Sequence, residues 1–112
     1  MLLVAQVRQG KCALPSITHA DGSARLQTVS AQTNPLYHAL IKEFGRQTGV
    51  PIVINTSFNV RGEPIVCTPA DAYRCFMRTN MDLLAIGPYI LEKSTQPVWT
   101  ESPTWRDTLP LD

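Results

Sequence analysis

The sequence predicts an α/β (α+β) fold, a twisted mixed β-sheet with two packed helices. Apolar, strand-like segments alternate with two helix-like segments, in the order strand, helix, strand, helix, strand. Both helix-like segments open with a capping residue followed by proline. The chain has 112 residues, of which 44% are hydrophobic and 17% charged, so it can bury one modest core. A helical connection further allows a right-handed crossover between parallel strands.

The N-terminal third predicts two strands joined by a turn. LLVAQV, at residues 2–7, is an apolar run followed by a polar turn. Asp21 and Gly22 favour a tight turn, because glycine accepts a positive φ without a Cβ clash. Apolar and polar residues then alternate in ARLQTVS, which predicts a strand over residues 24–30.

The clearest helix follows over residues 35–48. Asn34 can accept a backbone N–H as the N-cap, Pro35 suits the first helical position, and Gly49 ends the helix. PIVINT, at residues 51–56, is short, mostly apolar and rich in β-branched side chains. This composition is typical of a strand covered on both faces, so we expect it at the centre of the sheet.

The second half of the chain predicts another helix and the closing part of the sheet. Thr68 caps a helix that reaches about Thr79, with Pro69 and Asp71 in its first turn. MDLLAIG and PYILEK then predict one or two strands, because the Gly87–Pro88 pair breaks the apolar run between them.

Composition and charge restrict the classes of binding partner and the cellular compartment that we expect. Ten basic and nine acidic residues leave a net charge of +1, which disfavours nucleic acid and anionic membranes as partners. No apolar run approaches the roughly 18 residues that a membrane span needs, and the N-terminus lacks the pattern of a secretory signal. Three cysteines without CxxC spacing fit reduced thiols, and neither histidine stands at ligand spacing from a cysteine pair. We therefore expect a cytoplasmic protein without a metal site in this chain.

The most informative polar stretch is NTSFNVRGEP, at residues 55–64, directly after the predicted central strand. Ligands bind preferentially at the carboxyl ends of such strands. Ser57 and Asn59 can present a hydroxyl and an amide to one anion if Phe58 points into the core. Arg61 adds a charged donor. The alternative is an ordinary turn with self-capping side chains, because serine, asparagine and glycine are common loop residues.

Other charged residues extend the set of candidates. Arg25 can reach across the sheet toward an anion in the same crevice, or it is an exposed strand arginine. His19 and Asp21 have the chemistry of an acid/base pair, but their place in a turn favours an Asx-type hydrogen bond. Glu63 either binds a metal or pairs with Arg61. Neither a GxSxG motif nor a glycine-rich phosphate loop is present, so we assign no catalytic residue.

Four segments carry a family resemblance, namely LLVAQVR, LPSITHADGSARLQTVS, GVPIVINTSFNVRGEPIVCTPADAYRCFMRTNMDLLAIG and YILEK. In order and spacing they resemble the C-terminal part of the O-carbamoyltransferase family, which includes nodulation-factor and antibiotic-tailoring enzymes. The resemblance covers about residues 2–93. NTSFN followed by GEPIVCTP is its most specific piece.

The resemblance implies a partial YrdC-like domain that works on ATP and carbamoyl phosphate. In this family the two substrates give a carbamoyl-adenylate, and the carbamoyl group is transferred to an acceptor hydroxyl. Ser57 and Asn59 match a Ser-x-Asn element that holds phosphate groups, and Arg25 matches an arginine used on carbamoyl phosphate or the adenylate. Arg61 and His19 match recurrent positions without a specific role. Adenylate formation needs charge stabilisation on phosphate groups rather than a protein nucleophile, which suits these donors.

The same resemblance implies that much of the enzyme lies elsewhere. The family's Lys-x-Arg element and its metal-binding, actin-like transfer domain lie upstream of the matched segments. We expect residues 1–93 to form a truncated C-terminal part of the carbamoyltransferase domain, with an exposed sheet edge or apolar face that drives self-association. Residues 94–112 hold three prolines and predict a tail that is poorly ordered or laid across the surface. Two functions stay open, a fragment of the enzyme and a non-catalytic structural or interaction module.

Overall fold

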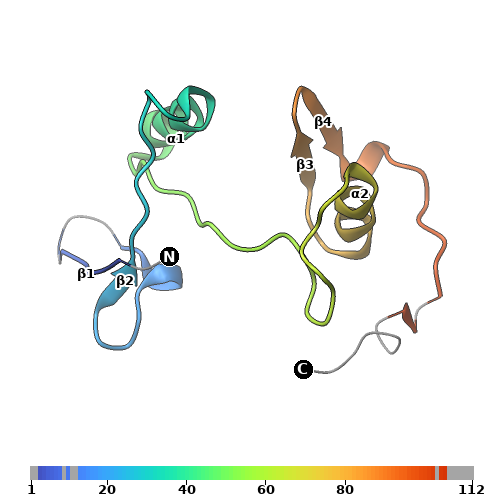
Figure 1. The fold of residues 1–112 in the computed structure, drawn as a ribbon, viewed down its shortest axis with the longest axis horizontal. Helices are drawn as coiled ribbons and strands as arrows, with labels where there is room; N and C mark the ends of the chain where they lie inside the picture. Colours follow the sequence, from blue (N-terminus) through green and yellow to red (C-terminus); the bar gives the residue numbers. More distant parts are fainter. Residues whose placement is uncertain (1–2, 9, 11–12, 103, 106–112) are drawn as a thin grey trace. The chain divides into compact units, whose positions relative to one another are not determined.

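The computed structural model describes residues 3–8, 10, 13–102 and 104–105. The chain divides into a first unit, Met1–Asn55, and a second unit, Thr56–Asp112. Among the described residues, each unit has one α-helix and one two-stranded antiparallel sheet (Figure 1). The predicted mixture of helices and strands is therefore confirmed. Within the described part of the chain, neither helix has the length and apolar character needed to cross a membrane.

The first unit begins with a hairpin. β1 (Val4–Gln6) pairs antiparallel with β2 (Ser23–Arg25). The connection contains a 3-10 helix, η1 (Pro15–Ile17), and a turn in which Gly22 has a φ of 79°. The predicted strand over residues 24–30 is shorter than expected, because its regular pairing ends at Arg25.

The helix of the first unit, α1 (Pro35–Thr48), has the predicted ends. The Asn34 side chain accepts the N–H of Tyr37 at 3.2 Å. Gly49 adopts the left-handed conformation with a φ of 79° and donates its N–H to Gly45 O at 2.8 Å. No residue of this helix is buried, so its apolar side chains stay at least partly exposed.

The segment after α1 does not form the predicted central strand. Residues 51–56 have no regular secondary structure and pair with no described strand, so both the strand and the crossover into it are wrong for this part of the chain. β-branched side chains favour extended backbone, whereas a strand also needs a neighbour that shares its hydrogen bonds. A side-chain hydrogen bond joins this segment to the stretch after β2, since Asn55 Nδ2 donates to Gln27 Oε1 at 2.6 Å.

In the second unit, α2 (Pro69–Arg78) is fixed at both ends. Thr68 Oγ1 accepts the N–H of Asp71 at 3.2 Å, and the Asp71 carboxylate accepts the N–H of Thr68 at 3.1 Å, which makes a capping box. Hydrogen bonds from Thr68, chiefly from its hydroxyl, lower the pKa of Asp71. Beyond the last turn, Lys93 Nζ donates to the carbonyl of Thr79 at 2.9 Å.

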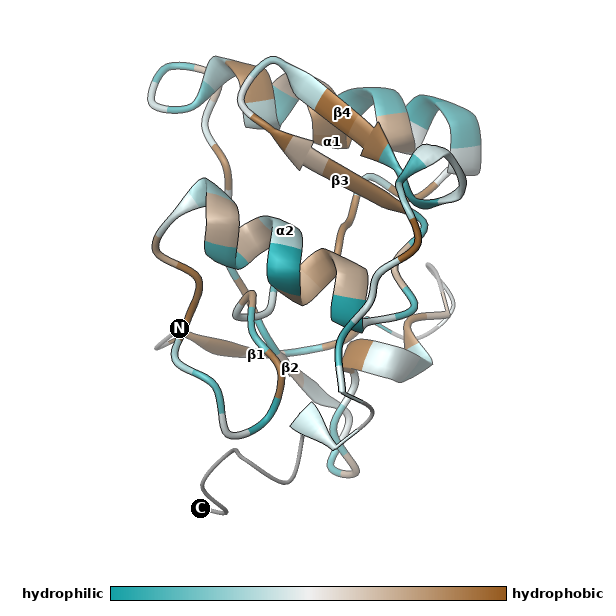
Figure 2. Ribbon diagram, turned by 90° about the vertical axis from the view of Figure 1, so that its right-hand side faces the viewer, coloured by the Kyte–Doolittle hydropathy of each residue, from teal (hydrophilic) through white to brown (hydrophobic). Residues whose placement is uncertain are grey.

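A hairpin closes the second unit and confirms the predicted closing strands. β3 (Leu83–Ile86) pairs antiparallel with β4 (Tyr89–Glu92). Gly87, with a φ of 54°, and Pro88 make the turn between them. Both strands carry mainly hydrophobic residues, as their brown colouring in Figure 2 shows.

A small core forms where α2 meets this hairpin. Phe76 is fully buried, and Ala72 and Leu84 are each 5% exposed. The partly buried side chains packed against them are Phe58, Val66, Tyr73, Met77, Met81, Ile86 and Leu91. All of these residues belong to the second unit. Among the described residues of the first unit, Ser23 alone is buried, so that unit has no comparable apolar core.

Candidate functional site

Most of the predicted site stretch lies in a closed loop of the second unit, residues 58–66. Val66 N donates to Phe58 O at 3.0 Å, so the two ends of the loop meet. Within it, Glu63 N donates to Val60 O at 3.0 Å and Gly62 has a φ of 84°. A positive φ at the third position of a turn suits glycine, so this turn depends on Gly62.

Phe58 and its neighbour Ser57 point in different directions, one toward the core and the other toward solvent. The Phe58 side chain packs against the core of the second unit, which is the orientation that the sequence required. Ser57 is exposed and makes no hydrogen bond or ion pair with another described residue. The Ser57 hydroxyl is therefore open to a ligand.

The Asn59 side chain forms its hydrogen bonds within the loop. Its Nδ2 donates to Val60 O at 3.2 Å and to Glu63 O at 2.9 Å. A side-chain amide has two N–H donors, so both are engaged by these carbonyls. In this conformation Asn59 stabilises the loop, which is the self-capping arrangement that the sequence offered as the alternative.

Arg61 occupies the exposed corner of the turn and forms no ion pair with a described residue. Glu63, considered as its partner or as a metal ligand, instead binds Arg78 of α2. The pairing of Glu63 with Arg61 is therefore wrong, and the Arg61 guanidinium keeps its charge open to anions. Over the described ranges, no three His, Cys, Asp or Glu side chains gather as a metal site.

Arg25 lies in the first unit, at the end of β2 and opposite Val4. It is exposed and, like Arg61, has no ion pair with another residue that the structure describes. The five predicted site residues are thus divided between the units. The first unit contains His19 and Arg25, and the second contains Ser57, Asn59 and Arg61.

His19, Asp21 and Ser23 form a hydrogen-bonded chain in the turn before β2. Asp21 Oδ1 accepts from Ser23 Oγ at 2.7 Å and from Ser23 N at 2.9 Å, which is the expected Asx-type turn. Because the Ser23 hydroxyl proton goes to the carboxylate, His19 Nδ1 donates to Ser23 Oγ across 3.0 Å. The hydrogen bonds from Ser23 lower the pKa of Asp21. His19 and Asp21 are therefore linked through a buried serine and do not pair directly.

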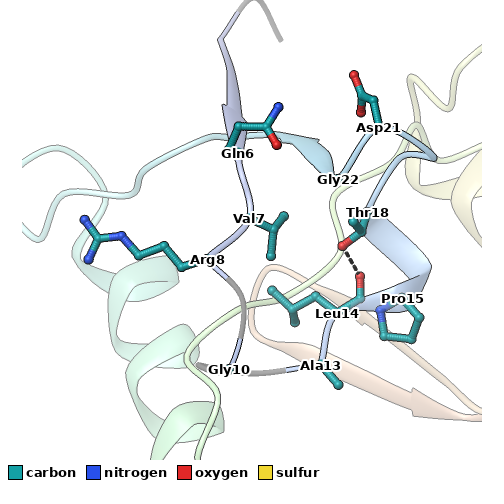
Figure 3. A pocket seen from close by; sticks show the side chains of 10 residues that line it. All are labelled: Gln6, Val7, Arg8, Gly10, Ala13, Leu14, Pro15, Thr18, Asp21 and Gly22. Carbon is teal, nitrogen blue, oxygen red and sulfur yellow. Dashed lines mark hydrogen bonds between the residues drawn. The ribbon is translucent and has the colours of Figure 1, made fainter.

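A hollow of about 490 Å³ lies beside this turn, bounded by residues of β1 and η1 (Figure 3). Arg8 and Asp21, which both line it, point away from one another. A ligand pocket usually has polar groups that converge on one point, and this hollow does not. None of the five predicted site residues lines it, so we do not assign the site there.

Arg78 is the polar residue that sequence reasoning missed. Its side chain is only 13% exposed, and its guanidinium binds both Glu63 of the loop and Glu101. These partners lie 15 and 23 residues away, so no local pattern predicts them. The one signal in the sequence is a basic residue in the last turn of α2, which also suits the helix dipole.

Comparison with known proteins gives a consistent set of relatives. Residues 1–93 match the family model described as carbamoyltransferase C-terminus. The chain is 54% identical over 99 residues to the uncharacterized protein sll1178 of Synechocystis sp., and 48% identical over 94 residues to the nodulation protein NolO of Bradyrhizobium diazoefficiens. It is 42% identical over 71 residues to the 3'-hydroxymethylcephem-O-carbamoyltransferase of Amycolatopsis lactamdurans.

The coverage of these relatives is uneven. The three alignments take in 88%, 83% and 63% of this chain, but 16%, 17% and 14% of the respective relatives. The chain thus spans about one sixth of the length of the curated relatives that it matches. Because the family model matches residues 1–93 of 112, the chain belongs to the carbamoyltransferase C-terminus family.

Proposed function

We propose that this chain supplies part of the substrate site of an O-carbamoyltransferase. In this role it helps to bind ATP and carbamoyl phosphate, which give a carbamoyl-adenylate whose carbamoyl group passes to an acceptor hydroxyl. Membership of the carbamoyltransferase C-terminus family over residues 1–93 carries the proposal. A relative whose name contains 3'-hydroxymethylcephem is consistent with an alcohol as the acceptor.

Arg25 and Arg61 are the proposed charged donors. Both are exposed, and neither has a carboxylate partner among the described residues. A guanidinium in this state can bind phosphate oxygens through two parallel hydrogen bonds. Each of these guanidinium groups, and the Ser57 hydroxyl of the second unit, is a donor that suits the negative charge on reacting phosphate groups, where no protein nucleophile is needed.

Asn59 and His19 have supporting roles in this proposal. Asn59 ties the loop to its own carbonyls, so that Ser57 and Arg61 are presented from a fixed backbone. His19 uses Nδ1 in its hydrogen bond with Ser23, which leaves Nε2 for a hydrogen bond with substrate.

A binding titration tests the proposal. The purified chain is titrated with carbamoyl phosphate, with ATP, and with both together, at low and at moderate salt, since salt screens exposed charges. We expect saturable binding that weakens about tenfold or more in Ser57→Ala and in Arg25→Ala, because each variant loses a hydrogen bond to a charged group.

Matched variants separate binding from folding. Ser16→Ala and Arg46→Ala remove an exposed serine and an exposed arginine of the first unit outside the proposed site, so we expect them to bind like the unmodified chain. Circular dichroism verifies that each variant keeps its helices. Absence of saturable binding by a folded, unmodified chain contradicts the proposal.

A second candidate is a non-catalytic interaction module, which the exposed apolar surface of the first unit favours. Leu36 is 80% exposed and Ile54 65% exposed. Phe44 and Ile52 line a largely apolar hollow of about 510 Å³. Surfaces of this kind promote association between proteins. Light scattering after size exclusion measures self-association, and together with the titration it decides between the two functions. A self-associated chain that binds neither substrate supports the module, whereas a chain that binds them supports the enzyme.

A further inference from the structure

The Arg78 guanidinium joins three parts of the second unit. It extends from the last turn of α2, binds Glu63 in the loop and Glu101 beyond β4, and stacks over the Trp105 ring with its central carbon 4.4 Å from the ring centroid. Its contact to Glu101 is a fork, in which Nε lies 2.8 Å from one carboxylate oxygen and a terminal nitrogen binds the other. The side chains of Glu63 and Glu101 are 15% and 25% exposed, respectively.

On the C-terminal side, residues 94–102, which we name the strap, are attached to α2 at two further points. Tyr73 Oη donates to Gln96 Oε1 at 3.3 Å, and the Tyr73 ring meets the Trp99 ring edge-on, with centroids 6.1 Å apart. Trp99 Nε1 in turn donates to Glu101 Oε2 at 2.9 Å. The Arg78 guanidinium and the Trp99 N–H lower the pKa of Glu101 to about 2. Glu101 is therefore an anion held by partners on two sides.

On the loop side, Glu63 closes the turn that carries Arg61. Its backbone N–H bonds to Val60 O, and its carbonyl accepts the Asn59 side chain. Its carboxylate leaves the loop and binds Arg78. Glu63 is thus bound to the turn through its backbone and to Arg78 through its side chain. A shift of the Arg78 guanidinium therefore moves the turn.

We propose that the strap positions the turn Asn59–Glu63 through Arg78, so that Arg78 and Glu101 are positioning residues for the anion site. This inference rests on the proposed function, because the turn matters only if Ser57 and Arg61 bind substrate. An arginine is required at this place: its planar fork serves two carboxylates at once, whereas a lysine presents a single point charge. The strap lies outside residues 1–93, the part that the family model matches.

A double-mutant cycle measured by amide hydrogen exchange tests the connection. The readouts are the amides of Glu63 and Val66, whose acceptors lie within the loop. We expect Glu101→Gln and Arg78→Lys each to speed their exchange about tenfold, because a charge-assisted hydrogen bond in the chain of contacts is lost. If the strap acts through Arg78, Glu101→Gln has no further effect in a Glu63→Gln background.

Two comparisons make this result specific. Glu43→Gln breaks a Glu–Arg pair of the first unit, in which Glu43 Oε1 lies 2.7 Å from Arg46, and it should leave the loop amides unchanged. Additive effects of Glu101→Gln and Glu63→Gln would overturn the proposal, since they would mean that the strap acts on α2 in general.

Titration of the same variants with carbamoyl phosphate and with inorganic phosphate links the strap to the site. We expect Glu101→Gln to weaken binding about threefold to tenfold, while Glu43→Gln binds like the unmodified chain. Absence of binding by the unmodified chain overturns the proposed function, and this role with it. Normal binding together with unchanged exchange in Glu101→Gln overturns only the positioning role proposed for the strap.

Discussion

In the part of the chain that the structure describes, the two units each combine one α-helix with one two-stranded sheet, yet they bury very different amounts of apolar surface. In the second unit, Phe76 of α2 is fully buried and Leu84 of β3 is 5% exposed. In the first unit, Leu36 of α1 is 80% exposed and Phe44 is 43% exposed. Packing stabilises the helix of the second unit, whereas the helix of the first unit rests mainly on its caps.

This difference separates local signals from tertiary packing. Both helices begin at a capping side chain followed by proline, so their boundaries are encoded locally in both units. Isolated helices of this length are marginal in water, because most helical stability comes from burial of an apolar face. The first unit therefore has the most to gain from a partner that covers α1.

The largest effect that tests this comparison is the loss of a core phenylalanine. We expect Phe76→Ala to lower the free energy of unfolding by about 3–5 kcal/mol, because it removes a fully buried ring and leaves a cavity. The matched change in the first unit, Phe44→Ala, should cost about 1 kcal/mol, since the ring is already partly in water. Urea unfolding followed by circular dichroism measures both.

Equal losses in the two variants would break the comparison. That outcome would mean that Phe44 is buried in solution, by a second copy of the chain or by contacts of its own unit. Repeating the unfolding at several protein concentrations distinguishes these cases, because burial by a second copy makes stability depend on concentration.

A smaller effect concerns Gly45 of α1, which Pro51 approaches closely where the chain continues after the helix. A Cβ at Gly45 would lie 2.7 Å from Pro51 Cβ and 2.9 Å from Pro51 Cα, and a backbone atom cannot move aside easily. We expect Gly45→Ala to destabilise the first unit by about 1–3 kcal/mol, as overpacking does. In an open helix the same change would instead stabilise by about 1 kcal/mol.

Thermal unfolding of Gly45→Ala beside Arg46→Ala measures this effect. Arg46 is the exposed neighbour on the same helix, so its replacement by alanine should change stability little. A gain in stability in Gly45→Ala would show that the segment after α1 leaves the helix in solution.

The elements that sequence could predict are those whose causes lie within a few residues. The caps at Asn34 and Thr68 and the break at Gly87–Pro88 depend on side-chain acceptors, proline and glycine next to the element itself. The strand over residues 51–56 failed for the opposite reason. Its apolar, β-branched residues favour a strand, but a strand also needs a paired neighbour, and pairing is not a local property.

The candidate site divides in the same way. The position of Phe58 in the core and the turn at Gly62 follow from local sequence, and so does the self-capping use of Asn59. The connection from Glu63 through Arg78 to Glu101 could not be predicted, because its members are far apart in the sequence and carry ordinary surface charges. Distant ion pairs emerge only when the chain is folded.

The smallest expected effect is a pH dependence confined to the second unit. The pKa of Glu101 is lowered from 4.5 to about 2, chiefly by its hydrogen bond with Arg78 and then by that with Trp99. A carboxyl group whose folded pKa is depressed stabilises the folded state fully above its ordinary pKa, and this contribution is lost as the pH falls through about 2. The two tryptophans of the chain, Trp99 and Trp105, both contact this ion pair, so their fluorescence reports on it.

We therefore expect tryptophan fluorescence to change between pH 4.5 and pH 2 in the unmodified chain, and this transition to be absent in Glu101→Gln. Glu43→Gln serves as the control, because the pKa of Glu43 is also lowered, by its hydrogen bonds with Arg46 and Gln47, but in the first unit. An unchanged transition in Glu101→Gln would show that another carboxylate controls the tryptophans. A transition lost in Glu43→Gln as well would mean that the two units respond to acid together, against the contrast drawn between them.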